Sequence, residues 1–108
     1  MARINKEFKG VVRYKDEEIT FTLREPSNEE LNTFLASRLE IGKRKDKVKD
    51  RTHEARCAFF DFLLVGVENL EDAEGVAITP QSKELIPANW KSAVIFERFE
   101  TEEIEIKN

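Results

Sequence analysis

The sequence predicts an α+β fold in which an N-terminal β-hairpin packs on a small bundle of about three α-helices. Three observations support this fold class. Apolar and polar residues alternate near the N-terminus, which is typical of half-buried strands. A helix-capping signal and a stripe of apolar side chains at helical spacing follow directly. The most apolar segment of the chain comes next, and its length and its alanine and leucine content favour a helix.

The chain has 108 residues and a mass of 12.6 kDa, which is the size of one domain. Hydrophobic residues make up 40% and charged residues 37%, so the chain can fill a core and is too apolar to be wholly disordered. A single cysteine excludes an internal disulfide and fits a reducing compartment. We expect the compact core to span about residues 8–99, with residues 1–7 and 100–108 as mobile tails.

Two predicted strands, at Phe8–Tyr14 and Ile19–Leu23, are joined by a short polar turn. In the second strand, Ile19, Phe21 and Leu23 alternate with polar residues, so they share one face. An isolated hairpin is marginally stable in water, so the rest of the chain must cover this apolar face. We expect the central helix to cover it.

The first helix is predicted over Asn28–Ile41. Ser27 and Glu30 match a capping box, in which each side chain accepts a backbone amide that has no partner within the helix. Four apolar side chains then keep helical spacing along one stripe: Leu31, Phe34, Leu35 and Leu39. Gly42 is suited to end the helix.

A strongly basic segment over residues 43–51 follows this helix. It carries six basic and two acidic side chains, a local net charge of +4, although the whole chain carries −4. The basic residues are Lys43, Arg44, Lys45, Lys47, Lys49 and Arg51. The segment is either a mobile loop or the solvated start of the next helix, for which Asp46, Asp50 and Thr52 are candidate N-caps.

This basic segment has three functional interpretations: a solvated surface, a patch for an acidic protein partner, or a nucleic-acid contact. An acidic partner surface could belong to a second copy of the chain, because residues 68–74 and 97–105 are acidic. Acidic residues interrupt the segment, it holds no aromatic residue for base stacking, and the rest of the chain is acidic. These features argue against nucleic acid.

The central helix is predicted over Ala55–Val67, with apolar side chains nearly all round and Gly66 near its end. Phe59, Phe60 and Phe62 point in three directions on such a helix, because successive residues are rotated by about 100°. Either all three fill the core, or part of this apolar surface forms a face that binds a client or a second copy.

The remainder of the chain predicts two further helical segments. An acidic connection follows the central helix, and Thr79–Pro80 then predicts a short helical turn over Gln81–Glu84. The last helix starts after Pro87 and has Trp90 among its apolar residues. The acidic tail beyond Phe99 is either a frayed end or an added edge strand.

Metal and nucleophile chemistry would depend on His53 and Cys57, the only residues of their kinds. Because they are four residues apart, they share a helix face and suggest half of a zinc site or a Cys–His pair. The alternative is structural, with a small buried cysteine beside a polar histidine at the start of the helix. Carboxylates alone remain as further zinc ligands, so we expect no metal site.

Paired carboxylates occur at Glu17–Glu18, Glu29–Glu30, Glu71–Asp72 and Glu102–Glu103, all in predicted turns, caps or tails. Acid–base catalysis needs environments that separate two pKa values, and solvated surface groups do not provide them. The sequence contains no glycine-rich phosphate loop and no G-x-S-x-G motif. We therefore expect no enzymatic activity, no catalytic residue and no cofactor.

The sequence gives no sign of a membrane segment. Its longest nearly apolar stretch, Ala58–Val67, contains Asp61 and is too short to cross a bilayer of about 30 Å. The N-terminus is polar and leads straight into a strand, without the apolar region of a signal peptide. We expect a cytoplasmic protein.

Two segments and their order along the chain resemble a known family. Leu23–Glu30 (LREPSNEE) opens the first helix, a phenylalanine- and leucine-rich helix follows, and Ile86–Lys91 (IPANWK) opens the last helix. This order is similar to that of the small tail assembly chaperones of long-tailed bacteriophages and prophages. The resemblance implies a non-enzymatic α+β protein of the bacterial host cytoplasm that self-associates. It also implies two partners: the hydrophobic, helical tape measure protein and the tail tube protein.

The candidate partner-binding residues are the six basic residues of segment 43–51 and four aromatic residues. They are Lys43, Arg44, Lys45, Lys47, Lys49, Arg51, Phe59, Phe60, Phe62 and Trp90. We expect a homo-oligomer with an apolar centre and a charged rim. The alternative function is a small cytoplasmic protein-interaction or nucleic-acid-binding domain that uses residues 43–51.

Overall fold

The computed structural model describes residues 4–41 and 48–100 and confirms an α+β fold with an N-terminal hairpin. The elements in chain order are β1 (Glu7–Tyr14), β2 (Glu17–Arg24), α1 (Asn28–Ser37), β3 (Leu39–Ile41), β4 (Val48–Asp50), α2 (Thr52–Leu63), β5 (Leu64–Glu68), the 3₁₀ helix η1 (Pro80–Leu85) and α3 (Ala88–Phe99). Within these described ranges, none of the helices has both the length and the hydropathy that crossing a membrane requires.

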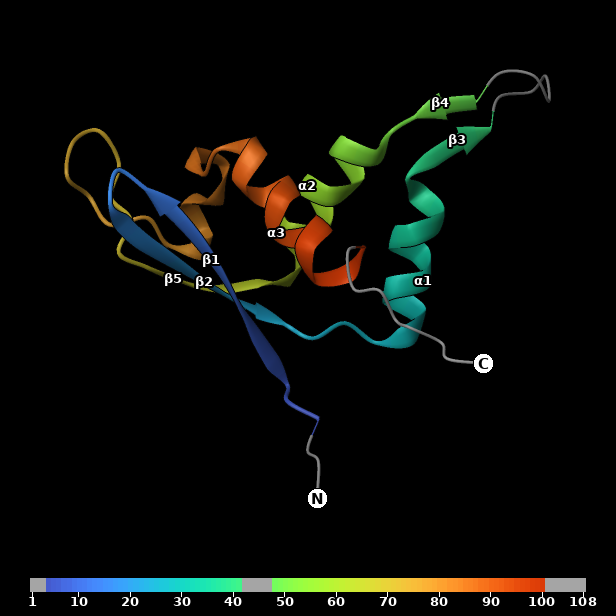
Figure 1. The fold of residues 1–108 in the computed structure, drawn as a ribbon, viewed down its shortest axis with the longest axis horizontal. Coiled ribbons are helices and arrows are strands. Elements are labelled where there is room, and N and C mark those ends of the chain that lie inside the picture. The colour runs from blue at the N-terminus through green and yellow to red at the C-terminus, as the bar shows by residue number, and fades with distance from the viewer. Residues whose placement is uncertain (1–3, 42–47, 101–108) are drawn as a thin grey trace.

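A three-stranded antiparallel sheet in the order β1–β2–β5 forms one layer of the fold. Lys15 and Asp16 join β1 to β2 with φ angles of 49° and 64°, the left-handed conformation that a two-residue hairpin turn needs. Tyr14 therefore lies opposite Glu17, and the register continues without a break along β1. A second sheet, made of β3 and β4, projects from the end of the molecule opposite this turn (Figure 1).

The apolar face of the hairpin packs on the central helix, as predicted. Ile19, Phe21 and Leu23 are buried in the core. The Phe21 ring meets the Phe60 ring of α2 edge to face, with centroids 5.2 Å apart. Aromatic pairs in this geometry add to the free energy gained by burial alone.

Helix α3 covers the same face of the sheet where it crosses β1 at Gly10. A Cβ atom at Gly10 would lie 2.6 Å from Cγ1 of Val94, so the close approach of helix and strand requires glycine. Val94 and Ile95 are both buried, and α3 therefore closes the core that α2 begins.

The predicted central helix is wrong at its C-terminal end, because α2 stops at Leu63 rather than Val67. Residues 64–68 form β5, which pairs with β2 and places Val67 opposite Phe21. Gly66 lies inside this strand, beside Thr22, instead of ending a helix. Pairing with β2 satisfies backbone groups that would otherwise lie at an open sheet edge, and this long-range gain outweighs the local helical pattern.

The predicted first helix is also too long, because α1 ends at Ser37 rather than Ile41. The Ser37 hydroxyl donates to the Phe34 carbonyl at 2.7 Å, and Nε of Arg38 donates to the Leu35 carbonyl at 3.1 Å. These side chains bond carbonyls of the last turn, so the chain can leave the helix there. Leu39, predicted in the apolar stripe, instead lies in β3 and is exposed.

The basic segment is only partly described. Gly42 and residues 43–47 lie outside the described residues, and residues 48–50 form β4. The sequence predicts a loop or the start of a helix for this segment, and both predictions are wrong for residues 48–50, which form a strand. The N-cap of α2 is Arg51, so neither Asp50 nor Thr52, the described candidates, takes that position. Asp50, one residue before the cap, accepts the Thr52 N–H at 2.8 Å.

The predicted helices near the C-terminus are confirmed. Thr79 Oγ1 accepts the Gln81 N–H at 3.3 Å at the start of η1, and α3 begins after Pro87. Residues 101–108 lie outside the described residues, so both predictions for the tail stay predictions.

Candidate functional site

A groove with a volume of about 370 Å³ lies between α1 and α2. Its lining residues are Glu29, Glu30, Thr33, Phe34 and Ser37 of α1, and Ala55, Ala58, Phe59 and Phe62 of α2. Each of these residues has another lining residue four positions away in the same helix, so each wall is one helical face. The volume is within the usual range of ligand pockets.

The rings of Phe34, Phe59 and Phe62, which line the groove, form an apolar layer, and Phe99 of α3 contacts this layer. The Phe34 ring stacks on the Phe59 ring with centroids 4.5 Å apart, and the ring of Phe99 from α3 contacts Phe59 at 5.4 Å. The Phe62 ring follows at 6.5 Å from Phe59, and Phe62 is 58% exposed. A large exposed aromatic side chain beside an apolar groove is typical of partner-binding surfaces.

The N-terminal end of α1 is fixed by the predicted capping box. The Ser27 hydroxyl accepts the Glu30 N–H at 3.1 Å, and the Glu30 carboxylate accepts the Ser27 N–H at 2.8 Å. The backbone N–H groups of Ser27 and Glu30, at this end of the groove, are therefore bonded within the chain.

Arg24, at the end of β2, connects this cap to the exposed ring. Its guanidinium donates two hydrogen bonds to the Glu30 carboxylate, at 2.9 and 3.2 Å, and lies 5.1 Å from the Phe62 ring centroid. The hydrogen bonds from Arg24 and then from the Ser27 backbone lower the pKa of Glu30 to about 2. Glu30 is thus ionised at neutral pH and holds Arg24 against the ring of Phe62.

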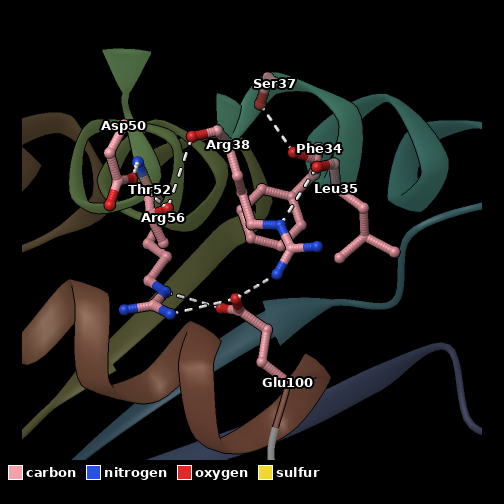
Figure 2. Close-up of polar contacts among 8 residues, drawn as sticks. All are labelled: Phe34, Leu35, Ser37, Arg38, Asp50, Thr52, Arg56 and Glu100. Atoms are coloured by element: carbon pink, nitrogen blue, oxygen red, sulfur yellow. Dashed lines mark hydrogen bonds and ion pairs between the residues drawn. The ribbon is translucent and has the colours of Figure 1, made fainter. Parts of the chain in front are cut away.

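A second polar cluster joins all three α-helices at the end of α3 (Figure 2). Nη1 of Arg38 donates to the Glu100 carboxylate at 2.7 Å, and Arg56 donates to it through Nε at 2.7 Å and Nη2 at 3.1 Å. The side chain of Glu100 is only 6% exposed. Burial would raise the pKa of Glu100, but the hydrogen bonds from Arg56 and Arg38 outweigh burial and keep it below the usual value. This carboxylate is thus a charged clamp that fixes α1 relative to α2 and α3.

The predicted aromatic site residues fall in three different places. Phe59 and Phe60 are buried core residues, and Phe62 alone of the three is exposed. Trp90 packs on Tyr14 at 5.4 Å, beside η1 and away from the groove.

Most of the predicted basic site lies beyond what the structure describes. Lys43, Arg44, Lys45 and Lys47 belong to the undescribed residues. Arg51 forms an ion pair with Glu40 and donates to Glu54 at 2.8 Å, so its charge is compensated locally. Lys49 is exposed in β4 and lies opposite Glu40.

His53 and Cys57 lie side by side on α2, as their spacing predicts. Cys57 Sγ is 3.7 Å from His53 Nε2, and the thiol donates to the Ala88 carbonyl at 3.4 Å. Burial raises the pKa of the Cys57 thiol, which disfavours the reactive thiolate. Among the described residues, no group of three or more histidine, cysteine or acidic side chains could hold a metal ion.

Most of the groove is not predicted by the sequence. The sequence places Phe34 only in an apolar stripe, and Ala55 and Ala58 only in a helix. The sequence does contain a pattern that indicates this groove. Ala55, Ala58 and Phe62 recur at intervals of three and four residues, so they form one helix face on which small residues lie beside an aromatic one. Arg24 and Glu100 carry no comparable signal, since their roles depend on contacts across the fold.

Comparison of the chain with protein-family models, curated proteins and solved structures finds no match.

Proposed function

We propose that this chain is a non-enzymatic chaperone of the phage tail assembly type, which holds an apolar helix of the tape measure protein in the α1–α2 groove. The observation that carries the proposal is the exposed Phe62 ring, which continues the apolar layer of Phe34 and Phe59 toward solvent. Amphipathic helices recurrently bind by laying their apolar face in a groove of this kind.

The length of the groove supports a helical client. Helix α1 has 10 residues, which corresponds to about 15 Å of helix axis. A client helix lying along it would present about three turns, with anchor side chains at positions i, i+3 or i+4, and i+7. Ala55 and Ala58 supply the space that these anchors would occupy.

The charge of the groove supports a client with basic residues beside its apolar stripe. The lining residues include the carboxylates of Glu29 and Glu30 and no basic side chain. Arg24 neutralises Glu30, whereas Glu29 is exposed at the rim. Complementary charge at a rim favours specificity and fast association.

The tail assembly context has a simple genetic test. A tape measure chaperone is expected to be encoded between the tail tube gene and the very long gene of the tape measure protein. A gene neighbourhood without tail genes would contradict this assignment and leave only the binding of a helix to be tested.

Binding is tested by isothermal titration calorimetry with a synthetic helix of about 20 residues that carries leucine at i, i+3 and i+7 and lysine beside this stripe. Ala58→Glu places a charged side chain in the groove, and Ala93→Glu places the same side chain on the exposed surface of α3. We expect Ala58→Glu to raise the Kd about tenfold or more and Ala93→Glu to leave it within about threefold.

The specificity of binding is tested with two altered peptides. A peptide with serine in place of leucine should not bind, and one with glutamate in place of lysine should bind more weakly at low salt. Equal binding by the Ala58→Glu and Ala93→Glu variants, or no binding by the wild-type protein, would contradict the proposed groove.

A further inference from the structure

Strand β1 is an edge strand, because it pairs only with β2 among the described residues. Tyr14 and Glu17 close a two-residue turn and therefore form a hydrogen-bonded pair. Counted from Tyr14, every second residue of β1 directs its backbone N–H and C=O groups toward β2. The Lys6 carbonyl fits this alternation, because it accepts the Glu25 N–H at 2.8 Å. The residues in between direct their backbone N–H and C=O groups away from β2. They are Glu7, Lys9, Val11 and Arg13.

A hollow lies beside this outward edge. One part has a volume of about 330 Å³ and is lined by residues 8–11 of β1 and by Val94, Glu97 and Arg98 of α3, with no residue of β2. An adjoining part of about 490 Å³ shares Phe8 with the first and extends to Ile4. The outer side of β1 therefore has space beside backbone groups that form no strand pairing with residues 4–41 or 48–100.

The sequence of β1 restricts how a second copy of this strand could pair with it. Outward residues must meet outward residues in an antiparallel pair, and within Glu7–Tyr14 the two registers with the longest overlap are centred on Gly10 and on Val11. The register centred on Val11 places Lys9 opposite Arg13, a like-charge pair. The register centred on Gly10 avoids this pair. It places Glu7 opposite Arg13 twice, once on each side of the symmetry axis.

The same register matches the apolar side chains of the core face. Phe8 and Val12 are half-buried and pack against the core of their own copy. With the strands centred on Gly10, Phe8 of each copy lies opposite Val12 of the other. The pairing would therefore bury apolar surface that is exposed in one copy and would satisfy about eight outward backbone hydrogen-bonding groups in each copy.

We propose that two copies of this chain pair antiparallel through β1, centred on Gly10, so that their sheets become one continuous sheet. The interface is isologous, with Glu7–Arg13 pairs at its two ends and the Phe8–Val12 pairs facing the core. This proposal does not depend on the helix-binding groove, which lies on α1 and α2.

The hydrogen bonding is tested by sedimentation velocity over a protein concentration series. Val11→Pro removes an N–H that points away from β2, so the hairpin keeps its own hydrogen bonds while strand addition is blocked. Val11→Thr keeps the N–H and a β-branched side chain. We expect Val11→Pro to raise the dimer Kd at least about tenfold and Val11→Thr to leave it within about threefold, with unchanged far-ultraviolet circular dichroism in both variants.

The register is tested by charge reversal and mixing. Glu7→Arg makes both end pairs Arg–Arg, and Arg13→Glu makes both Glu–Glu, so each variant alone should dimerise about tenfold more weakly. An equimolar mixture restores two Glu–Arg pairs and should recover the wild-type mass. The reversed residues also face like charges in their own hairpin, at Arg24 and Glu18, but that effect is identical in the separate and mixed samples.

Recovery on mixing supports the register centred on Gly10. Failure of the mixture to associate more tightly than either variant alone overturns it. A wild-type chain that stays monomeric at every concentration, or a Val11→Pro variant that dimerises like the wild type, overturns the pairing through β1.

Discussion

The rings of Phe34 and Phe59 stack face to face, with centroids 4.5 Å apart and planes inclined by 2°. This contact joins α1 to the central helix and is part of the groove between them. The clamp of Arg38 and Arg56 on Glu100 adds a second, polar connection between the same helices. With two connections of different chemistry, the groove is built into the folded chain before any client binds.

Truncation of the central helix should separate the roles of its buried and exposed aromatic residues. Phe59→Ala and Leu63→Ala should each lower the free energy of unfolding by about 2–5 kcal/mol, because both side chains are buried. Phe62→Ala should cost about 1 kcal/mol or less, since Phe62 is mostly exposed. Urea titration measures all three, and losses under about 1 kcal/mol at both Phe59 and Leu63 would contradict the described core.

Removal of the helix cap should destabilise α1. Ser27→Ala should cost about 1 kcal/mol, because the Glu30 N–H loses its acceptor. Asn32→Ala, an exposed substitution inside the same helix, should cost nothing, since alanine has the higher helix propensity. Thermal melts of both variants give the comparison, and an unchanged midpoint for Ser27→Ala would mean that the cap does not stabilise the fold.

Acid should destabilise the fold through Glu30. A carboxyl whose pKa is lowered by folding stabilises the native state above its unfolded pKa, and this contribution is lost as the pH falls through the folded pKa. For Glu30 the window runs from its ordinary value of 4.5 down to about 2. Melting temperatures across this range should fall less steeply for Glu30→Gln than for the wild type.

The matched control for this pH dependence is Glu29→Gln. Glu29 is next to Glu30 in α1, but its carboxylate forms neither the capping box nor the bonds to Arg24. The Glu29→Gln variant keeps both contacts of Glu30, so the difference between the two variants reports those contacts. An identical slope for Glu30→Gln and the wild type would contradict the described Arg24–Glu30 contact.

Loss of the clamp carboxylate should loosen the three-helix junction. Glu100→Gln should cost about 2 kcal/mol, because it leaves two arginines close together without a counter-charge. A double-mutant cycle with Arg56→Gln should give a coupling energy of about 1 kcal/mol or more between Arg56 and Glu100. Additive effects of the two substitutions would show that the hydrogen bonds between them do not stabilise the protein.

The parts of the fold that local physics determines were predictable. The hairpin has its alternation and its polar turn in one short segment, and the Ser27–Glu30 cap and the Thr79–Pro80 start are signals within a few residues. The ends of the two longer helices were not predictable in this way. Val67 fits an apolar helix, but it joins a strand whose partner, β2, is distant in sequence. Leu39 fits a helical stripe, but it lies opposite Asp50 in the hairpin of β3 and β4.

The candidate site was predictable only in fragments. Helical geometry shows that Phe59, Phe60 and Phe62 point in different directions, but the position of α1 decides which ring becomes exposed. Glu100 was assigned to a tail, since its role requires Arg38, which is 62 residues away along the chain. Such contacts follow from the complete fold and leave no periodic pattern in the sequence.

The central claim, that the α1–α2 groove holds an apolar helix, is tested most directly by nuclear magnetic resonance. The ¹⁵N-labelled protein is titrated with the lysine-flanked leucine helix, and the backbone amide shifts are mapped on the structure. We expect the largest shifts at Thr33, Ser37, Ala55, Ala58 and Phe62, which line the groove. Shifts that instead gather on the β3–β4 hairpin or on β1, or an unchanged spectrum at saturating peptide, would contradict the claim.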